Sequence, residues 1–381
     1  MVEVRIGIVS DVAYPWVKGG LQATEHTEAE NLAKEHEVLF FTLQFPGMKD
    51  HFFKDGIQYM CVEKAKLSDL YVNGHRSVGL AIKFARALPK ALYQHKLDAL
   101  YVNTMPYLHL PAVKRYGSKT GAKIIFDAIE VWDKGYWSKY IGVIKGTLAY
   151  YFVRKALAGA DYYIANSSTT ASKLRNMGID SKRIRVFSPI VDLKELKAYN
   201  ASNCKGDGTV VFAGRLIKEK RVDLWIDAVS KAHELNKKVK GLIIGDGPEK
   251  DLLSKAIKER NASEFIEIRG FMESKTELYR KIASSSVFLN MSEREGLSAI
   301  SIESVALGTP VLLPNYTPIP KEVKKMCLVT STALLPEKIA EIVDSRKGDF
   351  IKNADEIKSF DTGRINKVFY SLIAGKHAAK Q

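Results

Sequence analysis

The chain has 381 residues, of which 46% are hydrophobic and 27% charged, and its formal net charge is +15. This length suits two domains of ordinary size, and no apolar run reaches the roughly 18 residues that suggest a membrane span. The positive charge attracts polyanions, anionic membranes or phosphorylated ligands and does not choose among them. The three cysteines, Cys61, Cys204 and Cys327, lie far apart and indicate neither a disulfide framework nor a metal site.

The first half of the chain alternates short β-rich runs with segments of helical periodicity. Its first run, MVEVRIGIVSD, has no basic leader or cleavage site and is typical of a strand, which predicts a cytoplasmic protein. A helix is expected from about residue 21 to residue 35. Further strands are predicted at 37–43, 97–103, 122–128, 161–167 and 183–188.

The second half repeats this alternation more regularly, after a polar and turn-rich stretch at 188–208 that is the predicted linker. Gly308 is expected to cap the last helix of this half. Such alternation predicts an α/β fold with two Rossmann-like lobes, each built on a parallel sheet that helices cover on both faces. The predicted strands are 209–214, 239–245, 265–270, 287–292 and 309–314, and the predicted helices are 221–235, 249–260, 275–285 and about 299–307.

Residues that follow the strands of the second half are candidate ligand contacts, because ligands of such sheets bind beyond the carboxyl ends of the strands. Arg215 and Lys220 follow the first of these strands, and a bidentate fork beside a point charge suits a diphosphate. Gly296, Leu297 and Ser298 are expected to present backbone amides at a helix N-terminus, which would be a second anion site.

Two glutamates, Glu295 and Glu303, lie eight positions apart in the run SEREGLSAISIESVALGTPVL. Glu295 follows a predicted strand, so its carboxylate is placed to accept hydrogen bonds from sugar hydroxyls. Glu303, about one turn into the next helix, is expected to face the same crevice and to contact a ribose. A solvated helix face is the alternative interpretation, but Gly296 after the first glutamate and ALGTPV after the second favour the ligand role.

Glycines and a histidine near strand ends have both structural and functional interpretations. Gly19 and Gly20 fit either a plain turn or a loop that approaches a phosphate. Gly245 and Gly247 fit either the turn after a buried strand or a ligand contact. His109 is interpreted as a helix-start or core residue rather than as a catalytic base.

Three segments, FAGRLIKEKRVDLWIDAV, LIIGDGPEKDLL and SEREGLSAISIESVALGTPVL, together resemble the donor-binding lobe of the retaining glycosyltransferases of family 4. The resemblance is strong from about Thr209 to Val323 and looser in the first half. It implies the GT-B fold, in which two Rossmann-like lobes with parallel sheets enclose an interlobe cleft. The implied lobes are an acceptor-side lobe at 1–190 and a donor-binding lobe at 209–365, with a helix or tail at 366–381 that packs back on the first lobe.

The resemblance also implies roles for individual residues. The Glu-x7-Glu pair of the family contacts the donor sugar and the ribose, and it corresponds here to Glu295 and Glu303. The arginine and lysine that hold the diphosphate in the family correspond to Arg215 and Lys220.

Two further positions and two departures complete the comparison with the family. The base-binding loop corresponds to Phe271 and Met272. Many members have Asn-Gly-Val-Asp at the end of the first lobe, where this chain has SPIVD. Many also have a histidine in a strand-end loop of the first lobe, where this chain has FDAIEVWD. Asp127 or Glu130 stands where that histidine would act, and with Asp133 they form an acidic cluster after a predicted strand.

The implied function is retaining transfer of a sugar from a nucleotide-diphosphate donor to an acceptor hydroxyl, without a cofactor. The chain contains no Asp-x-Asp, and two cations can neutralise a diphosphate, so transfer is expected to need no metal. A sugar-nucleotide epimerase or a phosphorylase of the same fold is the alternative. A dehydrogenase is disfavoured because no Gly-x-Gly-x-x-Gly follows the first strand, and a nucleic-acid binder because no recognised motif or concentrated basic segment occurs. A solute-binding protein would need export, and no signal peptide is found.

The segment KGYWSKYIGVIKGTLAYYFVRKALAGA, residues 134–160, contains five basic and six aromatic residues and no acidic residue. Aromatic rings and long cationic side chains suit the headgroup region of a membrane. The alternative is a helix that packs its apolar face on the sheet, but packing alone would not require the absence of acids. The segment predicts reversible docking on the anionic inner membrane face and a saccharide or glycolipid acceptor that is lipid-linked.

Overall fold

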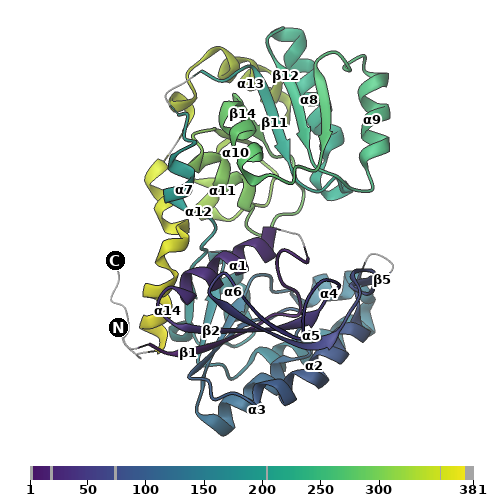
Figure 1. Cartoon of the computed structure of the whole chain (residues 1–381). Coiled ribbons are helices and arrows are strands. Elements are labelled where there is room, and N and C mark those ends of the chain that lie inside the picture. The colour runs from purple at the N-terminus through teal and green to yellow at the C-terminus, as the bar shows by residue number, and fades with distance from the viewer. Residues whose placement is uncertain (1–2, 18–19, 73–74, 203–204, 352, 374–381) are drawn as a thin grey trace. The chain divides into compact units, whose positions relative to one another are not determined.

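The computed structural model describes residues 3–17, 20–72, 75–202, 205–351 and 353–373. They form two compact units (Figure 1). Unit 1 consists of Met1–Pro189 and Thr362–Gln381, and unit 2 consists of Ile190–Asp361. The chain therefore completes unit 2 as one continuous segment and then returns to unit 1.

Unit 1 contains an eight-stranded sheet in the order β10-β9-β8-β7-β1-β2-β4-β3. All neighbouring strands run parallel except β3 and β4, which form an antiparallel hairpin at the edge. A separate two-stranded hairpin, β5 (Tyr71–Val72) and β6 (His75–Arg76), follows β4 in the chain. The strands of the sheet are β1 (Arg5–Val9), β2 (Glu37–Gln44), β3 (His51–Lys54), β4 (Ile57–Lys64), β7 (Ala99–Asn103), β8 (Lys123–Ala128), β9 (Tyr162–Ala165) and β10 (Ile184–Val186).

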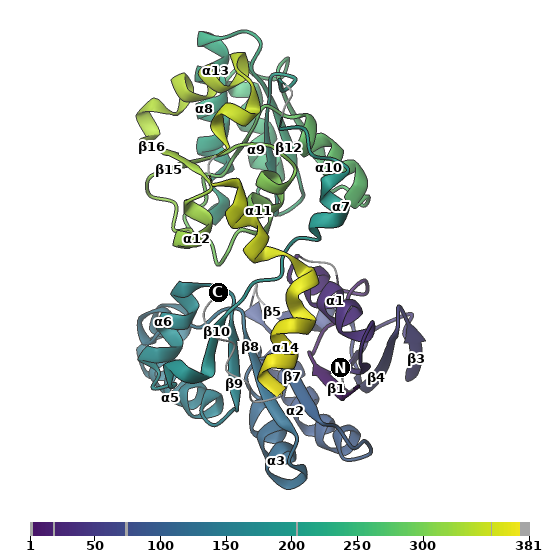
Figure 2. The same cartoon turned by 90° about the vertical axis from the view of Figure 1, so that its left-hand side faces the viewer.

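Helices cover both faces of the unit 1 sheet (Figure 2). On one face, Ile6 and Ile8 of β1 belong to the same buried cluster as Leu32 of α1 and Phe369 of α14. The other face carries a second cluster that includes Phe84 of α2. The helices of unit 1 are α1 (Gly20–Ala33), α2 (Val78–Leu92), α3 (Leu110–Thr120), α4 (Lys134–Ile141), α5 (Val143–Leu157), α6 (Ser168–Asn176) and α14 (Ile365–Ile373).

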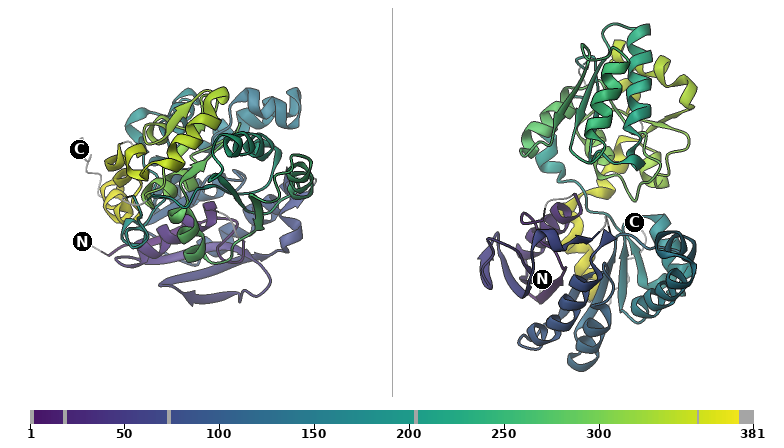
Figure 3. Two further views of the ribbon diagram at one scale, coloured as in Figure 1. Left: turned by 90° about the horizontal axis from the view of Figure 1, so that it is seen from above. Right: turned by 90° about the vertical axis from the view of Figure 1, so that its right-hand side faces the viewer.

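Unit 2 contains a six-stranded, wholly parallel sheet in the order β13-β12-β11-β14-β15-β16. Numbered within the unit, this is the doubly wound order 3-2-1-4-5-6. Val210 and Phe212 of β11 pack in the cluster that contains Trp225, while Val211 packs with Ile302 on the opposite face, so both faces are covered (Figure 3).

The predicted strands and helices of unit 2 are observed, and the described residues add one strand and three helices that the sequence did not predict. The strands are β11 (Thr209–Ala213), β12 (Lys240–Ile244), β13 (Ile266–Gly270), β14 (Val287–Leu289), β15 (Val311–Pro314) and β16 (Leu328–Thr330). The helices are α7 (Leu193–Lys197), α8 (Val222–Leu235), α9 (Lys250–Glu259), α10 (Lys275–Ser284), α11 (Ala299–Ala306), α12 (Lys321–Lys324) and α13 (Leu335–Asp344). Gly308 has a φ of 78° just beyond α11, as a helix-ending glycine requires.

The structure does not show the whole stretch 188–208 as the linker that the sequence predicted. The boundary between the units lies between Pro189 and Ile190, at the start of this stretch, and α7 within it belongs to unit 2. Leu196 of α7 is buried in the core of unit 2, which accounts for the difference. Among the described residues, no helix combines the length and the apolar character needed to cross a bilayer.

Each parallel sheet has one place where the strand order reverses direction. In unit 2 this switch point lies between β11 and β14, and in unit 1 it lies between β1 and β7. Loops that leave the carboxyl ends of two such strands diverge to opposite faces and open a crevice, where ligands of doubly wound sheets bind. The loops after these four strands are therefore the places where a functional site is expected.

Candidate functional site

Backbone contacts hold the loops after β11 and β12 against each other. Gly245 has a φ of 150°, and a Cβ on it would lie 1.8 Å from the carbonyl oxygen of Gly214. A Cβ on Gly247 would lie 2.4 Å from the carbonyl oxygen of Leu216, whose own amide donates to the carbonyl of Asp246 at 2.9 Å. Glycine is therefore required at both positions, because any Cβ would prevent the loops from meeting. The close packing of the loops explains why Gly245 is a glycine in this turn.

Lys220 and Glu295 meet at the switch point of unit 2. Nζ of Lys220, at the end of the 3₁₀ turn Lys218–Lys220 after β11, lies 2.7 Å from Oε1 of Glu295 in the loop after β14. The two side chains are 23% and 8% exposed. Asn290, which is buried directly after β14, donates from Nδ2 to the same oxygen at 3.2 Å. Glu295 is therefore a largely buried carboxylate that a cation and an amide hold in place.

Further bonds that the sequence did not indicate join the same two loops. The backbone amide of Glu293 donates to the carbonyl of Glu219 at 2.9 Å. Arg221 forms a salt bridge with Glu293 and a second one with Asp223 at 3.0 Å. Arg215 precedes this turn, directly after Gly214, and is exposed. The loop after β11 thus presents Arg215 to solvent and engages Lys220 and Arg221 in ion pairs.

Helix α11 begins at Ala299, shortly after Glu295 in the chain. Ser298 precedes the helix in a left-handed conformation with a φ of 65°, and its Oγ lies 2.7 Å from Oγ of Ser301. Leu297 is buried in the core, whereas a Cβ on Gly296 would have no neighbour within 4 Å. The positive end of the dipole of α11 is therefore close to the Lys220 and Glu295 pair, as an anion site requires.

Glu303 belongs to a different hydrogen-bond network. The hydroxyl of Tyr279 on α10 donates to Oε1 of Glu303 at 2.9 Å. Burial raises the pKa of Glu303, while the nearby ammonium of Lys275 opposes this rise. In the part of the chain that the structure describes, the side-chain hydrogen bond of Glu303 leads to α10 and none leads to Glu295.

Phe271 and Met272 follow β13, beside the loops already described. The amide of Gly245 donates to the carbonyl of Gly270 at 2.8 Å, which ties the β13 end to the β12 end. The side chain of Phe271 is 59% exposed, and Met272 packs partly against the core. An exposed aromatic ring beyond the carboxyl end of a strand offers a flat surface on which a base can stack.

A buried carboxyl cluster, defined by Glu25, Glu28 and Asp127, lies at the switch point of unit 1. The glutamates are three positions apart on α1, Asp127 is near the end of β8, and each residue is less than one-tenth exposed. Tyr101 of β7 donates to Oε2 of Glu28 at 2.9 Å, and Nδ2 of Asn103 donates to Oε1 of Glu25 at 3.3 Å. The sequence predicted Asp127 and missed both glutamates, whose signal was their helical spacing on a segment expected to pack on the sheet.

The carboxyl cluster retains protons that exposed carboxyl groups would lose. Burial raises the pKa of Glu25 to about 8 and the pKa of Asp127 to about 7, and it raises the pKa of Glu28 well above its ordinary value. The charge of Asp127 contributes further to the raised pKa of both glutamates. Groups that titrate near neutral pH are suited to proton transfer, which makes Asp127 a candidate for the acceptor-side chemistry.

Glu130 and Asp133 occupy the loop after β8. The backbone carbonyl of Glu130 accepts a hydrogen bond from the hydroxyl of Tyr107 at 2.9 Å, and the residue is partly buried. Oδ1 of Asp133 accepts from the amide of Tyr136 at 2.8 Å and so caps α4. The acidic cluster predicted after this strand therefore separates into a buried Asp127, a partly buried Glu130 and a helix cap.

His109 and the N-terminal glycines complete the predicted residues. His109 directly precedes α3 and is fully buried, with Nε2 at 2.9 Å from the carbonyl oxygen of Asn103. Burial lowers its pKa to about 4, and the structural interpretation of this histidine is confirmed. Gly20 is the first residue of α1, whereas Gly19 lies outside the described residues.

Two family models match the chain one after the other. The model described as Glycosyltransferase Family 4 matches residues 18–195, and the model described as Glycosyl transferases group 1 matches residues 198–353. The chain belongs to the family 4 glycosyltransferases. The first model covers most of unit 1, and the second covers the sheet of unit 2 with its switch point.

Known proteins similar to this glycosyltransferase include two glycolipid synthases. The α-monoglucosyldiacylglycerol synthase of Acholeplasma laidlawii is 24% identical over 332 residues, which are 81% of this chain and 80% of the synthase. The synthase of the same name from Streptococcus pneumoniae is 24% identical over 327 residues, or 81% of this chain and 70% of the synthase.

A solved structure resembles the glycosyltransferase over almost its whole length. The structure of Anabaena HepE in complex with UDP and glucose covers 98% of this chain and 100% of HepE, with a TM-score of 0.69 and 14% identity. Together with the two parallel-sheet units, this likeness shows the GT-B fold that the sequence predicted.

The carboxyl cluster leads to a prediction about stability and pH. We expect the unfolding free energy of the glycosyltransferase to fall as the pH rises from about 4.5 to about 8. In this window, unfolded Glu25 has lost a proton that the folded chain retains, because its pKa rises from 4.5 to about 8 on folding. Each such group contributes a slope of roughly 1.4 kcal/mol per pH unit. Urea unfolding at several pH values measures this slope.

The variant Glu25→Gln has no proton to exchange, so its unfolding free energy should depend less on pH than that of the wild type. Glu234→Gln is the matched control, since Glu234 is an exposed glutamate on α8. Equal slopes in the wild type and in Glu25→Gln would contradict the assignment of a raised pKa to this residue.

Proposed function

We propose that this glycosyltransferase moves a sugar from a nucleotide-diphosphate donor to a hydroxyl of a lipid acceptor at an anionic membrane surface, with retention of the anomeric configuration. The observation that carries the proposal is an apolar stripe on the outside of α5, in a segment whose only charged side chains are basic. The donor side rests on the loops at the switch point of unit 2, and the acceptor side on unit 1.

The donor side supplies positive charge where a diphosphate leaves. Arg215 is exposed on the loop after β11, Lys220 lies on the same loop, and the start of α11 adds a helix dipole. Fixed charges and dipoles of this kind stabilise a leaving diphosphate without reorganisation during the reaction. The HepE structure contains UDP and glucose, so UDP-glucose is the first donor to test.

Glu295 is proposed to contact the donor sugar. Within the described residues, the bonds that it accepts from Lys220 and Asn290 both use Oε1. Oε2 is therefore available to a sugar hydroxyl, while Oε1 is paired with the ammonium of Lys220. The side chain of Glu303 accepts a hydrogen bond from Tyr279. Within the described residues, it shares no hydrogen bond with Lys220 or Glu295. We therefore assign it a separate role, a contact with the ribose of the nucleotide.

The membrane-facing surface that we propose is the exposed face of α5. Ile144, Leu148 and Tyr151 recur at helical spacing and are 79%, 67% and 53% exposed, and Val143 at the helix start is 73% exposed. These side chains lie among basic residues of the acid-free segment 134–160. Burial of apolar side chains combined with attraction of cations to anionic lipid is the usual basis of reversible membrane docking.

The aromatic residues of α4 do not contribute as the sequence suggested. Tyr136, Trp137 and Tyr140 pack around Trp132, with ring centroids 4.5 to 4.9 Å from it. They form a partly buried aromatic cluster around Trp132 rather than a row of fully exposed rings. The apolar surface is instead supplied mainly by the aliphatic residues of α5, which the composition of the segment did not single out.

The packing of α4 on α5 fixes this surface. Gly146 of α5 lies so close to α4 that a Cβ on it would be 2.5 Å from the backbone of Trp137. The two helices therefore pack together as one hairpin. This packing fixes the orientation of the apolar stripe on α5. Two relatives named as glycolipid synthases support a lipid acceptor at such a surface.

The first prediction from this proposal concerns the two glutamates. Glu295→Ala should lower transfer by roughly a hundredfold or more while nucleoside diphosphate still binds, because the sugar contact is lost and Lys220 remains. Glu303→Gln should weaken binding of the nucleoside diphosphate roughly tenfold, and glutamine still accepts the hydroxyl of Tyr279. Titration calorimetry and a transfer assay measure the two effects.

Glu277→Gln on the exposed side of α10 is the control for both glutamate variants and should change neither quantity. An equal loss of nucleotide affinity in Glu295→Ala and Glu303→Gln would contradict the separate roles proposed for them.

The second prediction is that transfer needs no divalent metal ion. With UDP-glucose and diacylglycerol in anionic vesicles, the rate should stay within about twofold when EDTA is added, because protein cations neutralise the diphosphate. The anomeric configuration of the product, read by NMR, tests retention in the same experiment. Activity that EDTA abolishes and Mn²⁺ restores would show that the phosphate site is assigned wrongly.

The third prediction concerns the α5 surface. The protein should pellet with phosphatidylglycerol vesicles at low salt, less at high salt, and little with phosphatidylcholine vesicles. Leu148→Asp should reduce the bound fraction about tenfold, since burial of one leucine is worth roughly 1.5–3 kcal/mol. Leu252→Asp on α9, where the leucine is 62% exposed, is the matched control. Equal pelleting with both vesicle types, or an equal effect of the two variants, would remove the membrane claim.

A further inference from the structure

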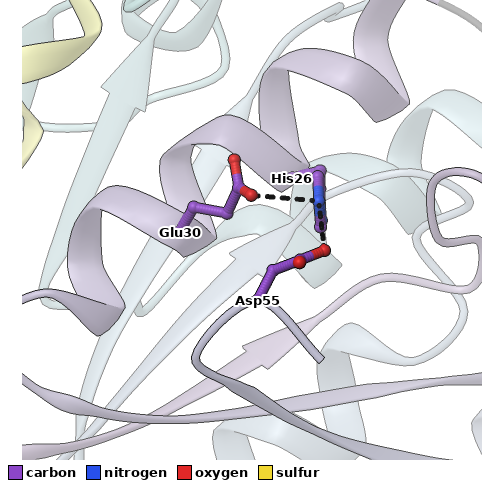
Figure 4. A group of neighbouring side chains, drawn as sticks. All are labelled: His26, Glu30 and Asp55. Carbon is purple, nitrogen blue, oxygen red and sulfur yellow. Dashed lines mark ion pairs between the residues drawn. The ribbon is translucent and has the colours of Figure 1, made fainter. Parts of the chain in front are cut away.

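Three side chains of unit 1 converge at the outer edge of its sheet, away from the switch point. His26 and Glu30 are four positions apart on α1, and Asp55 lies in the turn of the β3–β4 hairpin (Figure 4). Nε2 of His26 lies 3.5 Å from Oε1 of Glu30 and 3.4 Å from Oδ2 of Asp55. One ligand atom from each residue lies within 4.8 Å of the others.

The positions of these three residues are fixed by the fold. His26 and Glu30 occupy one face of an α-helix. Asp55 and Gly56 have φ values of 54° and 78°, which are the values of a two-residue hairpin turn that joins β3 to β4. Tyr59 of β4 lies with its hydroxyl 3.0 Å from Nδ1 of His26 and so holds the imidazole ring.

The imidazole of His26 is buried and points at the two carboxylates. Its side chain is 10% exposed, whereas those of Glu30 and Asp55 are 39% and 38% exposed. Distances of 3.4 and 3.5 Å exceed those of charged hydrogen bonds, which are about 2.7–2.9 Å. They match the edge of a tetrahedral zinc site, which is about 3.3–3.5 Å for zinc–ligand bonds of 2.0–2.2 Å.

We propose that His26, Glu30 and Asp55 bind a divalent transition-metal ion of the Zn²⁺ class, which clamps the β3–β4 hairpin to α1. One imidazole nitrogen and two carboxylate oxygens are ligands that Zn²⁺ accepts, and a water would complete the tetrahedron. The contact of Nδ1 with Tyr59 is the outer bond that orients a ligating histidine. This site is separate from the donor loops of unit 2 and has a structural role.

Lys54 competes with the ion for one ligand atom. Its Nζ lies 2.6 Å from Oδ2 of Asp55, the same oxygen that faces His26. The lysine side chain is 42% exposed and forms an ion pair at the surface, and such pairs are weak. The ion can therefore displace the ammonium into solvent, and removal of Lys54 should tighten metal binding.

Titration of the metal-free full chain with Zn²⁺ and Co²⁺ tests the proposal. We expect one equivalent to bind, the visible absorption of four-coordinate Co²⁺ to appear, and Zn²⁺ to raise the midpoint of thermal unfolding by about 2 °C or more. His26→Ala and Asp55→Asn should abolish these signals, and Lys54→Gln should lower the Zn²⁺ dissociation constant several-fold. Asparagine tolerates the left-handed conformation of Asp55.

Two further variants keep the outcome unambiguous. Glu30→Gln changes a partly exposed side chain on a helix surface, so it should fold and still lose metal affinity. His51→Ala, at an exposed position of β3 in the same hairpin, is the matched control and should bind as the wild type does. Absence of stoichiometric binding, or binding that survives both His26→Ala and Glu30→Gln, would overturn the proposal.

Discussion

The parallel pairing of β11 with β12 on one side and with β14 on the other is the constraint on which the candidate site of unit 2 depends. Parallel strands all end at one edge of the sheet, so their loops must share the same space. Glycines without a Cβ allow the loops after β11 and β12 to touch. Backbone and ion-pair contacts then join the β11 loop to the β14 loop, and Lys220 meets Glu295 across a sequence separation of 75 residues. The pair is a product of topology and not of local sequence.

Both units have a switch point in a parallel sheet, but the charged residues that gather there differ between the units. At the switch point of unit 2, cations and a helix N-terminus face a carboxylate, and this combination suits an anionic donor. At the switch point of unit 1, carboxyl groups are buried together and retain protons near neutral pH. Burial of carboxyl groups lowers the stability of the folded chain. Buried acids with strongly raised pKa values are common at functional sites. In the proposed function an acceptor hydroxyl loses its proton during transfer, and a buried acid with a pKa near 7 suits that step.

Much of the fold could be predicted from the sequence, because strand and helix periodicities are local properties. The strand predicted at 209–214 is observed as Thr209–Ala213, and Gly308 follows α11 in the expected left-handed conformation. Loop side chains were less predictable, because periodicity shows which face a residue occupies but not which partner it finds. The composition of 134–160 indicated a surface role for its aromatic rings, yet three of them pack around Trp132 and are partly buried. The burial of Glu25 and Glu28 depends on strands far away in the sequence, and their helical spacing alone did not indicate which side chains they would meet.

Helix α14 belongs to unit 1, although the whole of unit 2 precedes it in the chain. Its residues Ile365, Phe369 and Leu372 are buried in the same cluster as β1 and α1, and the ring of Phe369 lies 5.9 Å from that of Tyr101. A ribosome makes the chain from its N-terminus, so the apolar face that receives α14 stays uncovered while 172 residues of unit 2 are synthesised, from Ile190 to Asp361. The second unit can therefore finish folding before the first, and the unit synthesised first is the last to close its core.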